Sequence, residues 1–421
     1  MSVLNFLMKD VLSQPPVLVG LMALIGLIAL RKSFSEVISG TFKSIIGFLI
    51  LIAGAVTLIG SLNHLGNILQ QGFNIKGVIP NNEAIVALAQ QTLGRETALI
   101  MGLGFLANIL FARITPFKYI FLTGHHTFYM AALLSAVLGT AGLSGFGLAI
   151  TGALILGALM VLMPAMAQPF MRRITDSNDI ALGHFGTIGY VAAGLVGQVA
   201  GNPKHSTEDI KLPQSLEFLK NSLVATALTM MIIFLVLVLA AGKEVVEKIS
   251  GGQNYIMFAV MQSLTFAAGV SVILAGVRMI LGEIVPAFKG IAEKIVPEAI
   301  PALDCPVVFP YASTAVLIGF LSSFVGGLLS MLVLGPVGLP LIIPGLVPHF
   351  FTGATAGVFG NATGGRRGAV LGGFVNGVLI SFIPALLLPV LGDLGFANTT
   401  FGDSDFGIVG IIIGIIARGL Q

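Results

Sequence analysis

A series of long apolar stretches constrains the fold of this chain more than any other feature of its sequence. A helix needs about 20 apolar residues to cross the roughly 30 Å hydrocarbon core of a bilayer. Stretches of about that length lie near residues 16–30, 44–63, 97–112, 128–143, 146–166, 222–241, 255–277, 307–335 and 368–392. Shorter apolar runs, interpreted as re-entrant hairpins or short crossings, lie at 180–200, 339–359 and 406–417. We therefore predict an all-α polytopic membrane protein with roughly ten or eleven transmembrane helices plus re-entrant hairpins.

The composition supports this class and excludes others. Charged residues make up 9% of the chain, against about 25% in a soluble domain. The 54 glycines and 19 prolines suit close helix packing and helix breaks beside a hydrated cavity. The sequence contains no phosphate-binding loop, zinc-protease motif or serine-hydrolase motif, and its single cysteine, Cys305, provides no metal-site spacing. We expect no cofactor, no metal, no catalytic residue and no nucleic-acid partner.

The distribution of Lys and Arg predicts the topology. Arg31, Lys32 and Lys43 follow the first apolar stretch, whereas Lys9 and Asp10 before it cancel. The positive-inside rule therefore puts that first loop in the cytoplasm and the N-terminus outside. No basic region and cleavage site precede the first apolar stretch, so we expect a retained helix and not a signal peptide.

The longest polar stretch, residues 201–220, is expected to be a central cytoplasmic loop. It divides a single membrane domain, 1–421, into halves of about 14–200 and 222–421. A basic amphipathic segment follows a helix in each half, and internal repeats are common in transporters, so we predict two inverted repeats. The second of these segments, 282–299, fits an interfacial helix or a cytoplasmic connector.

Asp304 is the most informative single residue. It is the one carboxylate in the apolar, proline-broken segment 301–306. An ionisable group at membrane depth is costly unless it faces a cavity or a partner, and irregular backbone is tolerated in the same places. We predict that Asp304 lines a polar cavity. The alternative is a carboxylate that only caps the apolar segment beginning at Val307.

Three histidines lie where water is scarce. His125 and His126 follow Gly124, and His184 follows Gly183, each at the edge of an apolar run. Imidazole both donates and accepts hydrogen bonds near neutral pH, so two such positions and Asp304 suit a polyhydroxylated ligand. A lone histidine on an apolar face is more often a packing residue. We expect His126 to point away from its neighbour and to be the weaker candidate.

Two further segments are interpreted as broken elements. Asn82 and Glu83 begin an apolar run too short to cross, which predicts a hairpin arm with an N-terminal cap. Both residues are also favourable at a helix N-terminus without any ligand. Residues 344–349 and 360–367 indicate a second broken element with a basic turn, at a hairpin tip, a partner-facing loop or the membrane interface.

Short motifs carry a family resemblance through most of the chain. They are Leu30-Arg31-Lys32-Ser33, residues 40–48, Leu122-Thr123-Gly124-His125, residues 208–213, Gly276-Val277-Arg278-Met279, Leu303-Asp304-Cys305 and Ile342-Ile343-Pro344-Gly345. In these motifs the chain resembles the ascorbate-type EIIC membrane components of the bacterial phosphotransferase system. The resemblance implies a homodimer in the bacterial inner membrane, with a core domain that carries the substrate like an elevator past a V-motif domain. It also implies separate cytoplasmic partners, EIIA and EIIB, and phosphorylation of the substrate by a cysteine of EIIB; Cys305 is not that cysteine.

The resemblance also implies a set of substrate-binding positions. They are Asn82, Glu83, His125, Tyr129, His184, Phe185 and Asp304. Asn82-Glu83 stand where ascorbate-type proteins have Thr-Tyr, and Tyr129 and Phe185 replace glutamines and would supply ring faces. Such exchanges redirect specificity, and a charged Glu83 would repel ascorbate. The expected substrate is therefore L-ascorbate or a related sugar or polyol.

Two other functional classes remain open at the level of sequence. A gradient-driven carrier would use Asp304 or Glu83 as a proton relay. An intramembrane enzyme would use Asp304 and a histidine as acid and base. The enzyme is disfavoured because no second intramembrane carboxylate lies near Asp304 in the sequence.

Overall fold

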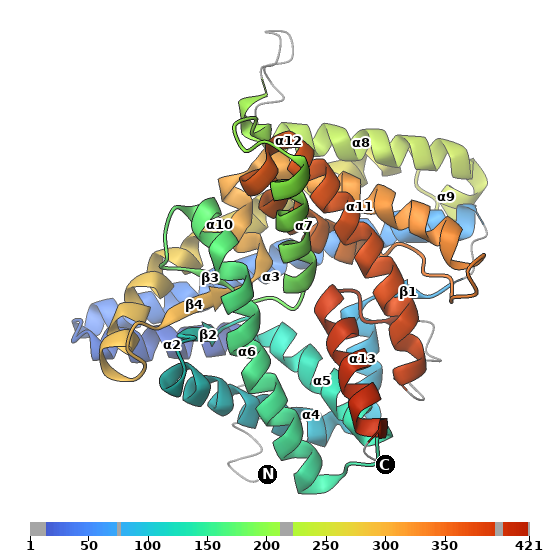
Figure 1. The fold of residues 1–421 in the computed structure, drawn as a ribbon. Coiled ribbons are helices and arrows are strands. Elements are labelled where there is room, and N and C mark those ends of the chain that lie inside the picture. The colour runs from blue at the N-terminus through green and yellow to red at the C-terminus, as the bar shows by residue number, and fades with distance from the viewer. Residues whose placement is uncertain (1–13, 74–76, 211–221, 392–398, 420–421) are drawn as a thin grey trace.

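The computed structural model describes residues 14–73, 77–210, 222–391 and 399–419, and helices dominate it (Figure 1). The helices are α2 (Pro15–Ala29), α3 (Phe34–Gly72), α4 (Asn82–Ile114), α5 (Gly124–Thr140), α6 (Gly145–Thr175), α7 (Thr187–Ala200), α8 (Ser222–Ala241), α9 (Lys243–Ile249), α10 (Tyr255–Lys294), α11 (Ser313–Leu334), α12 (Leu346–Leu387) and α13 (Ser404–Gly419). Short 3-10 helices are η2 (Thr207–Asp209), η4 (Cys305–Tyr311) and η5 (Leu388–Val390). Within the described ranges, 6 helices are long and apolar enough to cross a membrane. The chain is therefore an all-α membrane protein, as predicted.

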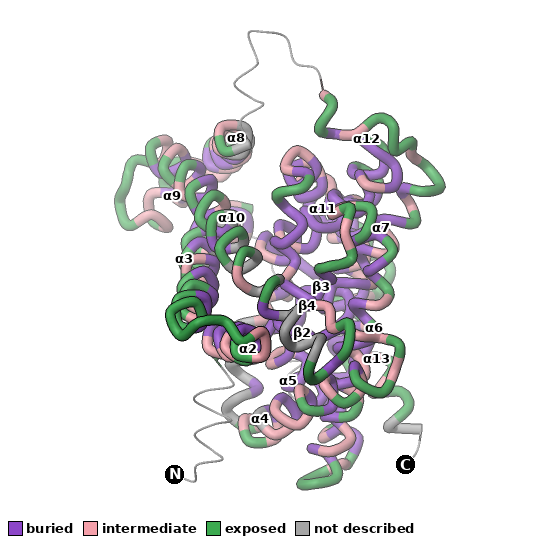
Figure 2. Tube along the Cα trace, turned by 90° about the vertical axis from the view of Figure 1, so that its left-hand side faces the viewer, coloured by how far each residue is buried: buried purple, intermediate pink, exposed green. Residues whose placement is uncertain are grey.

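The helices pack in two groups. Helices α3 and α10 contact each other, and both also contact α2 and α8; α9 joins them through α3 and α8. The other group contains α4 with α5 and α6, and α12 with α7, α11 and α13. Figure 2 shows α3, α8, α9 and α10 along one side of the molecule and α6, α7, α11 and α13 along the other. The boundary between the two groups positions the site described below.

Among the residues that the structure describes, five very short strands, which the sequence analysis did not predict, lie between the helices. They are β1 (Ile79–Pro80), β2 (Tyr119–Phe121), β3 (Ala181–Leu182), β4 (Ile300–Leu303) and β5 (Thr399–Thr400), and they form parallel sheets in the orders β1-β5 and β2-β4-β3. Each strand precedes a helix in the chain. The backbone of these strands is not helical, and it lies inside the protein. Such backbone must pair its N–H and C=O groups internally, and the strands provide those partners.

The register of the central strand brings distant segments together. In β4, Ala302 pairs with both Phe121 and Ala181, and Leu303 pairs with Leu182. A side chain at Gly183 is excluded, because its Cβ would lie 2.5 Å from the carbonyl oxygen of Ala302. The N-terminal ends of α5, α7 and η4 therefore meet at one place.

The predicted broken element near residue 365 is confirmed. Gly365 has φ of 59° and ψ of −146°, so α12 consists of two helices across a kink. The described part of the central loop, 201–210, binds this kink. Asn202 N donates to Gly364 O at 2.9 Å, and Arg366 N donates to the carbonyl oxygen of His205 at 2.8 Å. The rest of the predicted loop lies outside the described residues.

Two element predictions were wrong. The run that begins at Asn82 is not a separate short arm, because it continues as the single helix α4 to Ile114. Residues 282–294 are neither a separate interfacial helix nor a connector, since they form the last turns of α10. The polar residues of this segment are Glu and Lys, which are good helix formers, and Pro286 is accommodated within α10.

Glu208 in the central loop caps a helix that is distant in sequence. Its carboxylate accepts hydrogen bonds from the backbone N–H groups of Thr314 and Ala315, both at 3.1 Å, at the start of α11. The N-cap residue Ala312 makes no such bond. We expect Glu208→Ala to lower the free energy of unfolding by about 1 kcal/mol, the usual loss on removing a cap. Thermal unfolding in detergent checks this, and Glu208→Gln should lose less because it keeps an acceptor oxygen.

Candidate functional site

A cavity of about 270 Å³ lies where the two helix groups meet. One wall is apolar and comes from α3 and α12, with Phe48, Leu51, Ile52, Val56, Ile59, Val347, Pro348 and Phe351. The other wall is mostly polar, with Asn81, Asn82, His125, His126, Tyr129, His184, Asp304, Cys305, Pro306 and Asp403. An apolar cavity wall with a few convergent polar groups is typical of a small-molecule site.

The polar wall is built from the starts of several helices. Asn82 is the first residue of α4, His125 lies in the first turn of α5, and Asp304 is the N-cap of η4. Asp403 directly precedes the start of α13, and His184 lies three residues before the start of α7. The two small sheets hold these ends together, because each strand leads into one of the helices. Side chains far apart in the sequence thus share one cavity.

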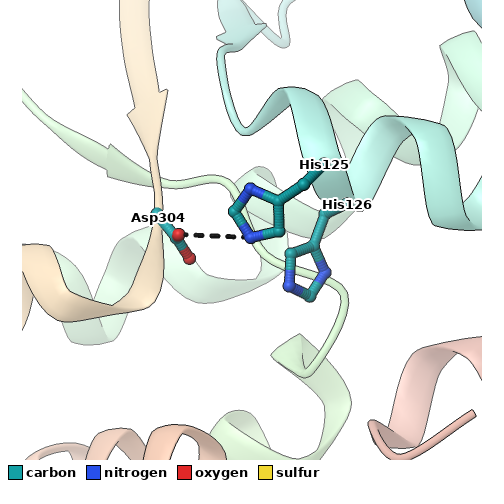
Figure 3. Close-up of side chains that lie close together, drawn as sticks. All are labelled: His125, His126 and Asp304. Carbon is teal, nitrogen blue, oxygen red and sulfur yellow. Dashed lines mark ion pairs between the residues drawn. The ribbon is translucent and has the colours of Figure 1, made fainter. Parts of the chain in front are cut away.

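Asp304 both caps a helix and faces the cavity, so both interpretations of this residue hold. Its Oδ1 accepts a hydrogen bond from Cys305 N at 2.7 Å. Its Oδ2 lies 3.4 Å from Nε2 of His125, and its Oδ1 lies 3.7 Å from Nε2 of His184. Figure 3 shows His125 at the start of α5 pointing toward Asp304 at the end of β4. The capping bond fixes the carboxylate between the two imidazoles.

The buried His184 is oriented from behind. Its Nδ1 makes a 2.8 Å hydrogen bond with the hydroxyl of Tyr190, a fully buried residue of α7. When the Tyr190 hydroxyl donates to Nδ1, the ring proton is on Nε2, toward the Asp304 carboxylate. This tautomer avoids two facing lone pairs, so His184 presents an N–H group near Asp304.

His126 was expected to point away, and this prediction was wrong. It lines the cavity, and its ring centroid lies 3.8 Å from that of His184. Nδ1 of His126 accepts a 3.4 Å hydrogen bond from Phe185 N, which places the ring proton on Nε2. Nε2 lies 3.8 Å from Oδ2 of Asp403. His126 therefore connects the group around Asp304 to a second carboxylate.

Asp403 is the site residue that the sequence analysis missed. Its Oδ2 accepts a hydrogen bond from Nδ2 of Asn82 at 3.2 Å, while Oδ1 of Asn82 accepts from Gly402 N at 2.8 Å. The pairing of β1 with β5 sets this register. A weaker signal was available, because Asp403 lies close to the short apolar run at 406–417, with Ser404 and Asp405 between them.

Three of the remaining predictions have different outcomes. Tyr129 lines the cavity, with its ring 5.7 Å from that of His125. Phe185 does not supply a ring face to the cavity; its side chain is fully buried and stacks on Phe121 at 4.9 Å. The side chain of Glu83 lies outside the described residues. Phe185 instead supports His126 through its backbone N–H.

Some of these groups also have the spacing of metal ligands. The sets His125-His126-Asp304, His126-His184-Asp403 and His184-Asp304-Cys305 each place their ligand atoms within 4.8 Å of one another. A histidine that binds a metal ion must present an unprotonated ring nitrogen to it. The hydrogen bonds of His126 and His184 instead put a proton on the cavity-facing nitrogen. The arrangement therefore favours hydroxyl groups, which pair with both N–H donors and carboxylate acceptors.

A second cavity adjoins the first. It has a volume of about 320 Å³ and shares Asn81 and Val347 with the site. Residues 343–345 line it, so the proline-broken segment at 344–349 begins at this second cavity. The two cavities together give the site a polar extension beside the end of β1.

The sequence matches a family model and a curated protein. A family model described as the sugar-specific permease component of the PTS system, EIIC-GAT, matches residues 10–405. The ascorbate-specific PTS system EIIC component of Mycoplasma pneumoniae is 26% identical over 366 residues. That match covers 76% of this chain and 55% of the relative, so the chain spans about half the length of the curated relative that it matches.

Proposed function

The chain belongs to the family of sugar-specific permease components (EIIC) of the phosphotransferase system, and from this premise we propose that it binds and translocates L-ascorbate or a related sugar or polyol. The observation that carries the proposal is the convergence of His125, His184 and Asp304 in one cavity. Imidazole N–H groups and a carboxylate together match the donors and acceptors of neighbouring hydroxyl groups. None of these residues needs to perform covalent chemistry.

The proposed movement is an elevator displacement of a core domain. Helices α4–α7 and α11–α13 would form this core, and α2, α3 and α8–α10 would form the V-motif domain that makes the homodimer contact. The cavity supports this division, because its apolar wall includes α3 and its polar wall belongs to the other group. Sliding the core along α3 would carry the bound ligand across the membrane without exposing the polar wall to lipid.

The proposed topology has ten or eleven crossings, two inverted repeats and an external N-terminus in a bacterial inner membrane. The strand pattern supports repeats, because each half of the chain contributes strands to both small sheets. Broken elements that meet near the midplane at a repeat interface are typical of transporter sites. The site at the ends of β1, β4 and β5 fits that pattern.

The proposed energy source is phosphorylation of the substrate by a cytoplasmic EIIB, itself phosphorylated through EIIA. Radiolabelled uptake in cells with and without EIIB tests this. We expect phosphorylated product to accumulate with EIIB and uptake to stop without it. Uptake that survives loss of EIIB but collapses with an uncoupler would instead favour a gradient-driven carrier with Asp304 as proton relay.

Membership of a permease family disfavours an intramembrane enzyme, whereas the spacing of carboxylates along the sequence does not. Asp403 is a second carboxylate in the same cavity, although it lies far from Asp304 in the chain. Product formed by the purified chain without a phosphorylated partner would revive the enzyme hypothesis. A permease component should form none.

A further inference from the structure

We propose that Asp403 is a second substrate-binding carboxylate, and that the two carboxylates make the cavity select an uncharged, hydroxyl-rich ligand over an anion. This inference rests on the proposed function, since it names the substrate class of the same cavity. It concerns a residue and a selectivity that neither the family match nor the curated relative specifies.

Asp403 occupies a built position and not an accidental one. Its side chain is 4% exposed, and its Oδ2 accepts a hydrogen bond from Nδ2 of Asn82 at 3.2 Å. The Asn82 side chain is itself fixed, because its Oδ1 accepts a hydrogen bond from Gly402 N. A buried carboxylate is costly unless its oxygens are hydrogen-bonded. The β1-β5 pairing and the first residue of α4 thus combine to present a carboxylate to a ligand cavity.

Asp304 and Asp403 lie at the two ends of a small polar network, which His126 connects. Ligand atoms of His126 lie within 4.8 Å of a carboxylate oxygen of Asp304 in one group and of Asp403 in another. An ionised carboxylate only accepts hydrogen bonds, with about four lone-pair sites. A ligand that bridges the network must therefore bring donors to both ends. Hydroxyl groups do so, and each hydroxyl oxygen also accepts from an imidazole N–H.

Two of the helix N-termini at the cavity are not available to a ligand anion. Helix N-termini usually favour anions, but the protein's own carboxylates occupy two of them. Asp304 accepts from Cys305 N at the start of η4. Asp405 accepts from Thr187 N and Ile188 N, each at 2.9 Å, at the start of α7.

The described residues that line the cavity include no Lys and no Arg. An anionic ligand such as ascorbate would thus be removed from water and placed beside two carboxylates with no Lys or Arg of the described lining to pair with it. Like charges in a poorly solvated site repel strongly. An uncharged polyol or sugar of similar size avoids this repulsion and satisfies the same acceptors.

Equilibrium binding to the purified full-length protein in detergent tests the inference with matched probes. The probes are tritiated xylitol, sorbitol, L-ascorbate and L-gulonolactone; the lactone resembles ascorbate in shape but carries no charge. We expect an uncharged probe to bind more tightly than ascorbate, and the lactone to exceed ascorbate by about 10-fold. Asp403→Asn should weaken the uncharged probes by about 10- to 100-fold, the usual effect of losing a hydrogen bond to a charged group. It should also reduce the preference for lactone over ascorbate.

Two further variants separate selectivity from folding. Asp403→Glu keeps the charge, so it should retain the preference for the lactone even where its affinity falls. Asp179→Asn, an exposed position, is the matched control and should change nothing. Tighter binding of ascorbate than of every uncharged probe would overturn the inference, as would an unchanged preference in Asp403→Asn. If ascorbate binding is then lost in Asp304→Asn, the proposed function stands without the inference; if no probe binds the wild type, both fail.

Discussion

Replacing Asp304 by Asn is expected to abolish measurable ligand binding, with a loss of at least about 100-fold in affinity. The carboxylate lies between His125 and His184, so the substitution removes the charge between the two rings and replaces one of the two acceptor oxygens by an NH2 donor. Hydrogen bonds to a charged group contribute about 1.5–3 kcal/mol each. Two such bonds correspond to about 3 kcal/mol or more, which is at least about 100-fold.

The same substitution should leave the fold intact. The amide oxygen of Asn can still accept the hydrogen bond from Cys305 N that caps η4. Radiolabelled binding and thermal unfolding of the same preparation separate the two effects, with Asp179→Asn as the matched control. Wild-type affinity in Asp304→Asn would mean that Asp304 is only a cap, the alternative that the sequence left open.

The helices were predictable because their signal is local. Apolar stretches near 16–30, 146–166 and 222–241 correspond to α2, α6 and α8, and the gap between the runs ending at 359 and beginning at 368 contains the kink at Gly365. The strands were not predictable, because each has at most four residues and pairs with a segment far along the chain. Periodicity carries no information about such pairing.

The site was predictable to the extent that single residues are exceptional in their surroundings. His125, His184 and Asp304 are polar residues beside apolar runs, and they do share a cavity. Asp403 has the same pattern, but only the pairing of β1 with β5 places it next to Asn82. The direction of neighbouring side chains was the weakest prediction. The turn after β3 puts His184 in the cavity and Phe185 behind it, and spacing alone does not distinguish these outcomes.

Replacing Gly357 by Leu is expected to prevent correct assembly of the helix group that carries the polar wall. Helices α11 and α12 cross through small residues, as membrane helices often do. A Cβ at Gly357 would lie 2.5 Å from both the carbonyl oxygen of Ala315 and the Cα of Gly319. Both are backbone atoms, so the helices must separate. Overpacking costs about 1–3 kcal/mol even when neighbouring side chains can adjust, and a whole isobutyl group against backbone should exceed that range.

The consequence should reach the ligand site, because α12 begins at Leu346 and its first turns supply Val347, Pro348 and Phe351 to the cavity wall. Size-exclusion chromatography and thermal unfolding should show little monodisperse Gly357→Leu protein, and Gly357→Ala should lie between it and the wild type. Gly147→Leu in α6 is the matched control, since a Cβ there meets no atom within 4 Å, and it should behave as the wild type. Equal stability of the Gly357 and Gly147 variants would show that α11 and α12 do not depend on this close approach.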